Sequence, residues 1–317
     1  MSDAYAQHLA ALHAGFEAPP ALIDDAAREV TASPVAARQR IVHGEANEVY
    51  RITFENGLQA ILRIARRNAA VFEKEAWAIG RCRALRMAVP EVLSVQDVDF
   101  EGERLALCFL ELLPGERLSD SLALPRETLR SVVRELARQL SWMHATRPED
   151  LGAAVRFFEN DTDDFLATAP EFVRLGTEAG LQRQALDQAI GAYETVMRRH
   201  GFGPRRLTHN DLRACHVLVH GGRLSGIIDF GQVSMDTPIN EFAKWDYWEA
   251  PALPVAWLRE DYADEALFDE LFDARFQALR LANALWALRW YALTGYAAGV
   301  ARAAASIERY VAELRGG

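Results

Sequence analysis

Cysteine is scarce in this chain, with only three among 317 residues. Cys82, Cys108 and Cys215 are odd in number, widely separated, and fit no metal-binding spacing. Structural disulfides are therefore not expected, and this usage is typical of a reducing, cytoplasmic setting. Cys215 is expected to be a small buried residue rather than a nucleophile.

The chain also lacks the segments that direct proteins to membranes. Residues 1–8 contain neither a basic region nor an apolar core, so we expect no signal peptide. The most apolar stretch, residues 281–301, is interrupted by Arg289 and Gly295. Such a stretch indicates a buried helix rather than a membrane span, and we expect no membrane partner.

An excess of positive charge is absent as well. Lys and Arg number 35 against 45 Asp and Glu, which gives a formal net charge of −10 and a pI near 5.4. Nucleic acid is therefore not expected as a partner, and an acidic protein is better matched to cationic ligands.

Apolar residues make up half of the chain, which is enough for one large or two modest domains with real cores. Alternating patterns favour strands over residues 38–43, 47–55, 58–65, 92–98 and 104–112, with Asn56-Gly57 as a hairpin turn. Helical spacing covers residues 2–15, 69–87, 125–146 and 181–200, and residues 264–299 are expected to hold two more helices. The pattern predicts a small antiparallel sheet with one inserted helix, followed by a mainly helical region.

The most informative segment begins at His209 and ends at Gly231. His209-x-Asp211 lies on a tight loop, and four residues separate Asp211 from His216, after which an apolar strand begins. The sequence His-Gly-Gly at 220–222 indicates a turn, and a return strand then leads to Asp229. Such a hairpin is expected to bring Asp211, His216 and Asp229 to one end.

Phosphoryl transfer from a nucleotide requires such a set of side chains. One carboxylate accepts the proton of the attacking hydroxyl, and two further ligands hold Mg²⁺ on the phosphates. Asp211 suits the first role, and His216 and Asp229 suit the second, although imidazole is a softer ligand than the oxygen donors that Mg²⁺ prefers. The alternatives are a turn residue for Asp211, a loop hydrogen bond for His216, and a core histidine for His209.

The ordered pair of H-x-D-x-x-x-x-H at 209–216 and D-F-G at 229–231 resembles the catalytic loop and metal-binding motif of the protein-kinase-like fold. More narrowly, it resembles the aminoglycoside phosphotransferase family of antibiotic kinases, and His216 in place of Asn is similar to aminoglycoside 2''- and macrolide 2'-phosphotransferases. The resemblance implies a bilobal α+β fold, with a small antiparallel-sheet N-lobe over residues 1–113 and a larger, mainly helical C-lobe over residues 114–317. It also implies a kinase that uses ATP or GTP with Mg²⁺, as a monomer or homodimer.

The resemblance assigns nucleotide-binding residues in the first lobe. The loop with Gly44 and Asn47 stands where the family covers the phosphates, although by itself it reads as an ordinary hairpin. Arg63 occupies the strand position where the family usually has Lys, and its expected partner is Glu75, with Glu73 as the alternative. Because guanidinium is planar and bidentate, this replacement is not a neutral one.

Residues 109–115 resemble the hinge of the family, where backbone groups at Glu111 and Leu113 would bind adenine. After the D-F-G motif, residues 236–243 resemble a structural segment of the family, with Glu241 in place of Asp, and no chemistry is assigned to them. The next residues combine aromatic and acidic side chains, which can hold a sugar ring and an ammonium group. Asp246 and Glu249 are therefore candidate substrate residues, with helix core and a solvated face as the alternative.

The resemblance and the acidic balance together make an aminoglycoside, a cationic small molecule, the first expected acceptor. A macrolide comes second, and choline, homoserine or a sugar would make the chain a metabolic kinase. Two other classes stay open. A metal-dependent phosphoesterase could use His209, Asp211, His216 and Asp229, but it needs more bridging carboxylates. A nucleotide-binding pseudokinase is suggested by Arg63 and by a phosphate loop with a single glycine.

Overall fold

The computed structural model describes residues 3–14, 17–44, 47–65, 70–151 and 161–316. The chain divides into two compact units. One consists of Met1–Glu116 with Ser225–Gly231, and the other consists of Arg117–Leu224 with Gln232–Gly317. Both helices and an antiparallel sheet are present, which confirms the α+β class expected from the sequence.

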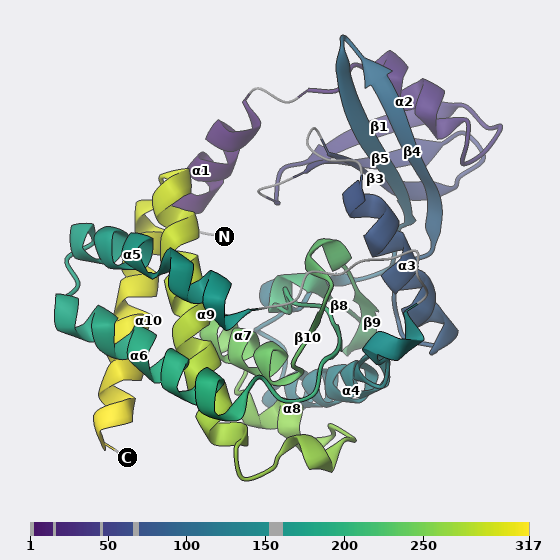
Figure 1. Cartoon of the computed structure of the whole chain (residues 1–317). Coiled ribbons are helices and arrows are strands. Elements are labelled where there is room, and N and C mark those ends of the chain that lie inside the picture. Colours follow the sequence, from purple (N-terminus) through teal and green to yellow (C-terminus); the bar gives the residue numbers. More distant parts are fainter. Residues whose placement is uncertain (1–2, 15–16, 45–46, 66–69, 152–160, 317) are drawn as a thin grey trace. The chain divides into compact units, whose positions relative to one another are not determined.

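The first unit is built on a five-stranded antiparallel sheet of order β1-β2-β3-β5-β4 (Figure 1). Its strands are β1 (Val35–Ile41), β2 (Glu48–Phe54), β3 (Gln59–Ala65), β4 (Val92–Phe100) and β5 (Glu103–Glu111). Buried and half-buried residues alternate along β2, because successive side chains point to opposite faces of a sheet. The Asn56-Gly57 turn joins β2 to β3 as predicted: Gly57 has a φ of 84°, and its N–H donates to the Phe54 carbonyl at 3.0 Å.

Three helices belong to the same unit: α1 (Asp3–His13), α2 (Pro20–Ala27) and α3 (Ala70–Ala84). The spacing of apolar residues predicts α1 and α3, but α2 is not expected from it. The buried Leu22 and Ile23 of α2 join the core that Tyr50, Ile52 and Phe54 form on β2. Helix α2 is short and begins with proline, which is favoured at the first helical position.

The chain after β5 is mainly helical, as predicted. Its longer elements are α4 (Arg126–His144), α5 (Thr162–Glu178), α6 (Arg183–His200), α7 (Ile239–Glu249), α8 (Ala256–Glu260), α9 (Phe272–Thr294) and α10 (Ala297–Gly316). Helices α9 and α10 run side by side (Figure 1). Among the described residues, no helix is both long and apolar enough to span a membrane.

Short strands frame the segment that carries the motifs. They are β6 (Glu116–Arg117), β7 (Arg206–Thr208), β8 (Val217–His220), β9 (Arg223–Ile227) and β10 (Ser234–Asp236). Strands β6, β8 and β9 form one sheet, and the turn between β8 and β9 contains Gly221 and Gly222 at φ values of 57° and 75°. Strand β10 pairs with β7 so that Ser234 lies opposite Thr208, the residue before His209. The predicted hairpin is therefore present, and the β7–β10 pair is an addition to it.

Candidate active site

The backbone of the loop that carries Asp211 is held in an unusual conformation. Asn210 has a φ of 59°, a region that few residues other than glycine adopt and that asparagine tolerates best. Its N–H donates to Glu241 Oε1 at 2.8 Å, and its carbonyl accepts a hydrogen bond from the Lys244 ammonium. The Asn240 amide donates to the Asn210 side-chain oxygen at 3.3 Å. Three residues of α7 thus fix the loop immediately before Asp211.

Asp211 is held by two histidines. Its N–H donates to Nδ1 of the fully buried His209 at 3.3 Å, and its carbonyl accepts a hydrogen bond from His216 Nδ1 at 2.8 Å. The Asp211 carboxylate lies 3.6 Å from the same His216 nitrogen, and 30% of its side chain is exposed. The second unit therefore brings two of the predicted site residues, Asp211 and His216, close to each other. The carboxylate of Asp211 stays accessible to solvent.

The hydrogen bond of His216 decides which ring nitrogen can bind a metal ion. A carbonyl oxygen only accepts, so Nδ1 must carry the proton. In the neutral ring the lone pair then lies on Nε2, which is the form of imidazole that ligates metals. A carbonyl at Nδ1 is also the arrangement that commonly orients a metal-bound histidine. These contacts fit His216 to the predicted role as a ligand.

In the first unit, Arg63 on β3 links Glu75 on α3 to Asp229. Arg63 Nη1 forms an ion pair with Glu75 Oε1, and Nη2 lies 2.9 Å from Asp229 Oδ1. The Arg63 and Glu75 side chains are 9% and 0% exposed, whereas the Asp229 side chain is 39% exposed. The guanidinium also lies 5.5 Å from the ring centre of Phe72. Three predicted site residues, distant in sequence, therefore meet in one contact, and Glu73 does not share it.

The backbone at Asp229 resembles that at Asn210, because its φ is 65°. Strained conformations of this kind persist where the surrounding structure imposes them, and they cluster at functional sites. Burial would lower the pKa of Arg63, but the Glu75 and Asp229 carboxylates raise it above its ordinary value. Burial raises the pKa of Glu75, and the Arg63 charge acts against this shift.

The predicted phosphate loop is only partly described, because Glu45 and Ala46 lie outside the described residues. The Gly44 carbonyl accepts a hydrogen bond from His13 Nε2 at 2.6 Å, and, its chain neighbours aside, no atom of the described residues lies within 4 Å of the position that a Cβ of Gly44 would take. Asn47 is half-buried just before β2.

The predicted hinge begins where β5 ends. Glu111 is the last residue of β5, and its carboxylate accepts a hydrogen bond from the Glu91 N–H at 3.0 Å. Leu113 follows outside any strand, and among the described residues its backbone N–H and carbonyl have no hydrogen-bond partner. Such groups are suited to bind a planar heterocycle that carries a donor and an acceptor.

Asp246 and Glu249, the predicted substrate residues, both lie on α7 and are engaged within the second unit. Asp246 Oδ2 lies 2.8 Å from Arg280 Nε, and its side chain is 14% exposed. Glu249 Oε1 accepts a hydrogen bond from the Ala214 N–H at 2.9 Å and so supports the same loop that carries Asp211. Burial raises the pKa of Glu249.

One expectation about the loop needs correction. Cys215 is not buried but has intermediate exposure, because the buried position of this single helical turn, η3 (Ala214–His216), is taken by Ala214. Glu241 lies in the segment that resembles a structural segment of the family and to which no chemistry is assigned, and its carboxylate holds the Asn210 N–H directly. Its likeness to an acidic residue in a structural segment of the family is the signal that could have revealed this contact.

Glu241 belongs to a buried polar cluster. Its carboxylate oxygen Oε1 lies 4.0 Å from His144 Nε2, and His144 Nδ1 is hydrogen-bonded to the Tyr262 hydroxyl at 2.8 Å. Burial raises the pKa of Glu241 to about 7, although the Asn210 N–H and the Lys244 charge act against it. Burial lowers the pKa of His144 to about 3.

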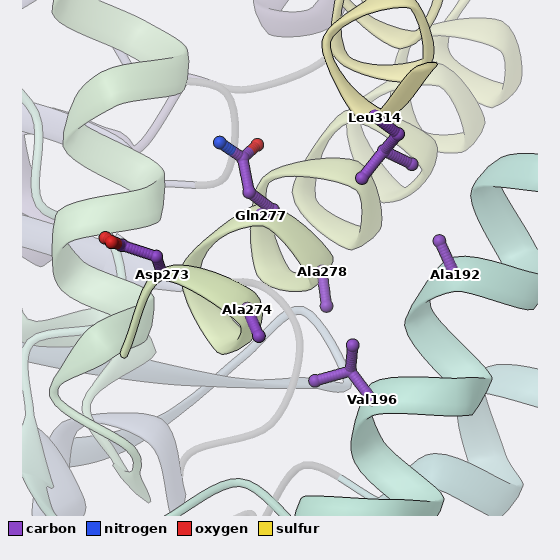
Figure 2. A pocket seen from close by; sticks show the side chains of 7 residues that line it. All are labelled: Ala192, Val196, Asp273, Ala274, Gln277, Ala278 and Leu314. Atoms are coloured by element: carbon purple, nitrogen blue, oxygen red, sulfur yellow. The ribbon is translucent and has the colours of Figure 1, made fainter. Parts of the chain in front are cut away.

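A pocket of about 330 Å³ lies elsewhere in the second unit, where α6, α9 and α10 meet (Figure 2). Most of its lining is apolar, from Ala192 and Val196 on α6, Ala274 and Ala278 on α9, and Leu314 on α10. Asp273 and Gln277 on α9 complete it. No predicted site residue lines it. Within the described ranges, no group of three or more His, Cys, Asp and Glu side chains is arranged to hold a metal ion.

Comparison with known proteins agrees with the motifs. A profile of the phosphotransferase enzyme family (APH) matches residues 37–254, which is more than half of the chain. The chain therefore belongs to this family, and it is a small-molecule phosphotransferase. The family resemblance that the sequence motifs predict is confirmed. No curated protein matches the chain in sequence.

Solved structures of antibiotic kinases share the fold. Aminoglycoside phosphotransferase APH(4)-Ia is 19% identical with a TM-score of 0.68, over 92% of this chain and 97% of that one. The GDP and kanamycin complex of APH(2")-IIia is 16% identical with a TM-score of 0.68, over 98% of both chains. Amicoumacin kinase hAmiN is 15% identical with a TM-score of 0.64, over 92% of this chain and 94% of that one. These likenesses confirm the kinase-like α+β fold predicted from the sequence.

Proposed function

We propose that the chain transfers the γ-phosphoryl group of ATP or GTP to a hydroxyl of a small molecule. The observation that carries the proposal is the contact of Arg63 with both Glu75 and Asp229. In phosphoryl transfer, a cation held by an acidic partner steadies the nucleotide phosphates, and a nearby carboxylate holds the metal ion. Residues 63, 75 and 229 stand in the chain where the family motifs require them.

Asp211 is proposed as the group that orients the acceptor hydroxyl and takes its proton. Its loop is fixed by the contact of Glu241 with the Asn210 N–H and by His209 and His216, and its carboxylate is partly exposed. A base that is rigidly held but reachable suits this step, since proton transfer requires hydrogen-bond distance to the hydroxyl.

Asp229 and His216 are the residues proposed to hold Mg²⁺. Two observations support this assignment. The Asp229 carboxylate is exposed, and Nδ1 of His216 donates its proton to the Asp211 carbonyl, which leaves Nε2 as the nitrogen that can bind the ion. When bound with a nucleotide, Mg²⁺ neutralises charge that develops on the β- and γ-phosphates. Gly44, Asn47, Glu111 and Leu113 are proposed to contact the nucleotide.

An aminoglycoside is the first acceptor that we propose. APH(4)-Ia is known in a ternary complex with AMP-PNP and hygromycin B, and APH(2")-IIia in a complex with GDP and kanamycin. The net charge of −10 favours a cationic acceptor in the same way. If the acceptor is a polycation, its KM should rise with ionic strength, because salt screens attraction between charges beyond a Debye length of about 8–10 Å.

The proposal is tested by incubating the protein with ³²P-labelled Mg²⁺-ATP or Mg²⁺-GTP and a panel of hydroxylated compounds. The panel holds aminoglycosides, macrolides, choline, homoserine and sugars. Label transferred to one of them identifies a kinase and its acceptor. Phosphate released from ester substrates without nucleotide would identify a phosphoesterase instead. Nucleotide binding without any turnover would identify a pseudokinase.

A further inference from the structure

The chain that precedes the sheet is hydrogen-bonded to the predicted phosphate loop on both sides, at Gly44 and at Glu48. His13 is the last residue of α1, and its Nε2 lies 2.6 Å from the Gly44 carbonyl oxygen. Because a carbonyl only accepts, Nε2 carries the proton and donates the hydrogen bond. Ala18, between α1 and α2, donates its N–H to Glu48 Oε1 at 2.6 Å. Glu48 is the first residue of β2, so one N-terminal segment holds the chain before and after the loop.

Both contacts are shielded from solvent. His13 is 4% exposed, Ala18 is 3% exposed and Glu48 is 1% exposed. Oε1 of Glu48 also accepts a hydrogen bond from the Tyr50 hydroxyl. Burial of a carboxylate is costly unless hydrogen-bond donors surround it. The Ala18 N–H and the Tyr50 hydroxyl therefore stabilise this carboxylate at the start of β2.

The backbone that carries the His13 imidazole is held as well. Arg40, on β1, donates from Nη2 to the His13 carbonyl at 3.3 Å. Leu9 lies one turn earlier on α1 and is completely buried. A helix end that is tied to a strand and packed through an apolar side chain leaves its last residue few alternative positions. His13 is thus a fixed donor rather than a mobile surface histidine.

The contact decides to which side the Gly44 carbonyl points. Backbone N–H groups bind phosphates, whereas a carbonyl oxygen carries negative partial charge and repels them. Glycine has no side chain that restricts its backbone, so the carbonyl of Gly44 can turn to either side. The hydrogen bond from His13 stabilises the conformation in which the oxygen faces α1. A hydrogen bond of this kind shifts such an equilibrium by roughly three- to tenfold.

Both donors lie outside the part of the chain on which the family assignment rests, because the family profile begins at residue 37. We propose that His13 is a positioning residue for nucleotide binding. It holds the Gly44 carbonyl toward α1 and so keeps the loop in the conformation that receives the phosphates, while Ala18 anchors the other side of the loop at Glu48. His13 acts through Gly44 and does not touch the nucleotide. The inference rests on the proposed function, in which Gly44 contacts the nucleotide.

The test compares the binding of a nucleotide with that of its nucleoside by calorimetry, on the whole protein in the presence of Mg²⁺. The probes are AMP-PNP with adenosine, or GMP-PNP with guanosine, according to the base that the protein prefers. His13→Phe keeps a planar ring but removes the donor, so it should weaken the nucleotide affinity roughly three- to tenfold. The nucleoside affinity should stay the same, because a nucleoside has no phosphate to meet the loop. His13→Gln retains a side-chain N–H and should restore most of the nucleotide affinity.

The control is His220→Phe, which removes an exposed imidazole from β8 of the second unit. It should bind nucleotide as the unmodified protein does, and urea unfolding verifies that each variant is folded. Equal nucleotide affinities of His13→Phe and His220→Phe would overturn the inference. An equal loss of nucleotide and nucleoside binding in His13→Phe would overturn it too, because such a loss indicates a general structural role.

A second measurement uses the unmodified protein and does not depend on the folding of a variant. The chain has eight histidines, and ¹⁵N-histidine labelling with His13→Gln as the reference identifies the signal of the His13 imidazole. The Nε2 proton should exchange slowly with water, because its hydrogen bond is buried. Its signal should shift when the nucleotide binds and stay in place when the nucleoside binds. A signal that the nucleotide leaves unchanged would overturn the inference.

The outcomes separate this inference from the proposed function. If the unmodified protein binds neither nucleotide, the proposed function and the inference both fail. If it binds one of them and the loss of the His13 donor has no effect, the inference alone fails. Binding is measured without an acceptor, so the identity of the acceptor does not influence the result.

Discussion

Arg63 Nη2 lies 2.9 Å from Asp229 Oδ1 while the same guanidinium forms an ion pair with the buried Glu75. One planar group thus aligns the carboxylate of the D-F-G motif and neutralises an acid that is completely buried. A lysine, the usual residue of the family at this position, presents a single ammonium rather than a planar fork with several donors. The replacement by Arg63 is therefore compatible with a working phosphate site.

Arg63→Met should destabilise the protein by roughly 3–5 kcal/mol, because it leaves the charge of Glu75 buried without a partner. Urea unfolding measures this loss. In the double variant with Glu75→Leu, most of the stability should return, since the buried charge is then gone. An Arg63→Met protein as stable as the unmodified one would contradict the importance of the pair.

Asp229→Ala should abolish the part of nucleotide binding that depends on Mg²⁺, because Asp229 is the carboxylate proposed to hold the ion that would neutralise the phosphates. Calorimetry with and without Mg²⁺ measures the difference. Asp99→Ala, which removes an exposed carboxylate from β4 of the same unit, serves as the control and should behave as the unmodified protein. Unchanged Mg²⁺-nucleotide affinity in Asp229→Ala would refute the assignment of the D-F-G motif.

His216→Asn should preserve activity, since an amide oxygen is a donor that Mg²⁺ prefers and can replace the imidazole. His216→Leu should lower kcat by roughly 10–100-fold, because loss of groups that hold or orient a metal has a cost of this size. The two variants are compared by steady-state kinetics at several Mg²⁺ concentrations. If the Leu variant is fully active, His216 only supports the loop.

The pH dependence of stability should reveal the buried Glu241. Its pKa is raised to about 7 by burial, so between pH 4.5 and 7 the folded state holds a proton that the unfolded state has lost. Stability must therefore fall as the pH rises through this range, by at most roughly 3 kcal/mol. His144 acts in the opposite sense: its lowered pKa of about 3 makes stability rise with pH between 3 and 6.5.

The contributions of Glu241 and His144 to the pH dependence of stability largely cancel between pH 4.5 and 6.5. The test therefore compares the unmodified protein with a variant that lacks the Glu241 carboxylate. In Glu241→Gln, which retains an oxygen for the Asn210 N–H, the His144 contribution stays and stability should rise more steeply from pH 5 to 6.5. Urea midpoints across this range measure the slope. A slope equal to that of the unmodified protein would show that Glu241 does not titrate there.

Local signals in the sequence predict much of the fold, and the resemblance to the family predicts one contact of the candidate site. Asn56-Gly57 predicts its hairpin because few other dipeptides adopt the turn so readily. The contact of Arg63 with Glu75 and Asp229 joins residues far apart in the chain. It could be predicted only because the motifs of the family relate these positions to each other.

Other features depend on tertiary packing that no local pattern reports. The eight residues of α2 are too few for a clear period, and the helix exists because Leu22 and Ile23 complete a core. Asp246 and Glu249 are acidic residues near aromatics in the sequence, but their pairing with Arg280 and with the Ala214 N–H comes from α9 and from the loop. Composition alone cannot distinguish carboxylates that are paired within the protein from carboxylates that are free to bind a substrate.

The most direct test of the account is a comparison of Asp211→Asn with the unmodified protein in transfer of the γ-phosphoryl group to an acceptor. The unmodified protein should transfer label from ³²P-ATP or ³²P-GTP to a hydroxylated small molecule. Asp211→Asn should bind nucleotide normally but lower kcat by roughly 10²–10⁴-fold, the usual consequence of losing a general base. A kcat within a few-fold of the unmodified protein would contradict the role of Asp211 and the account built on it.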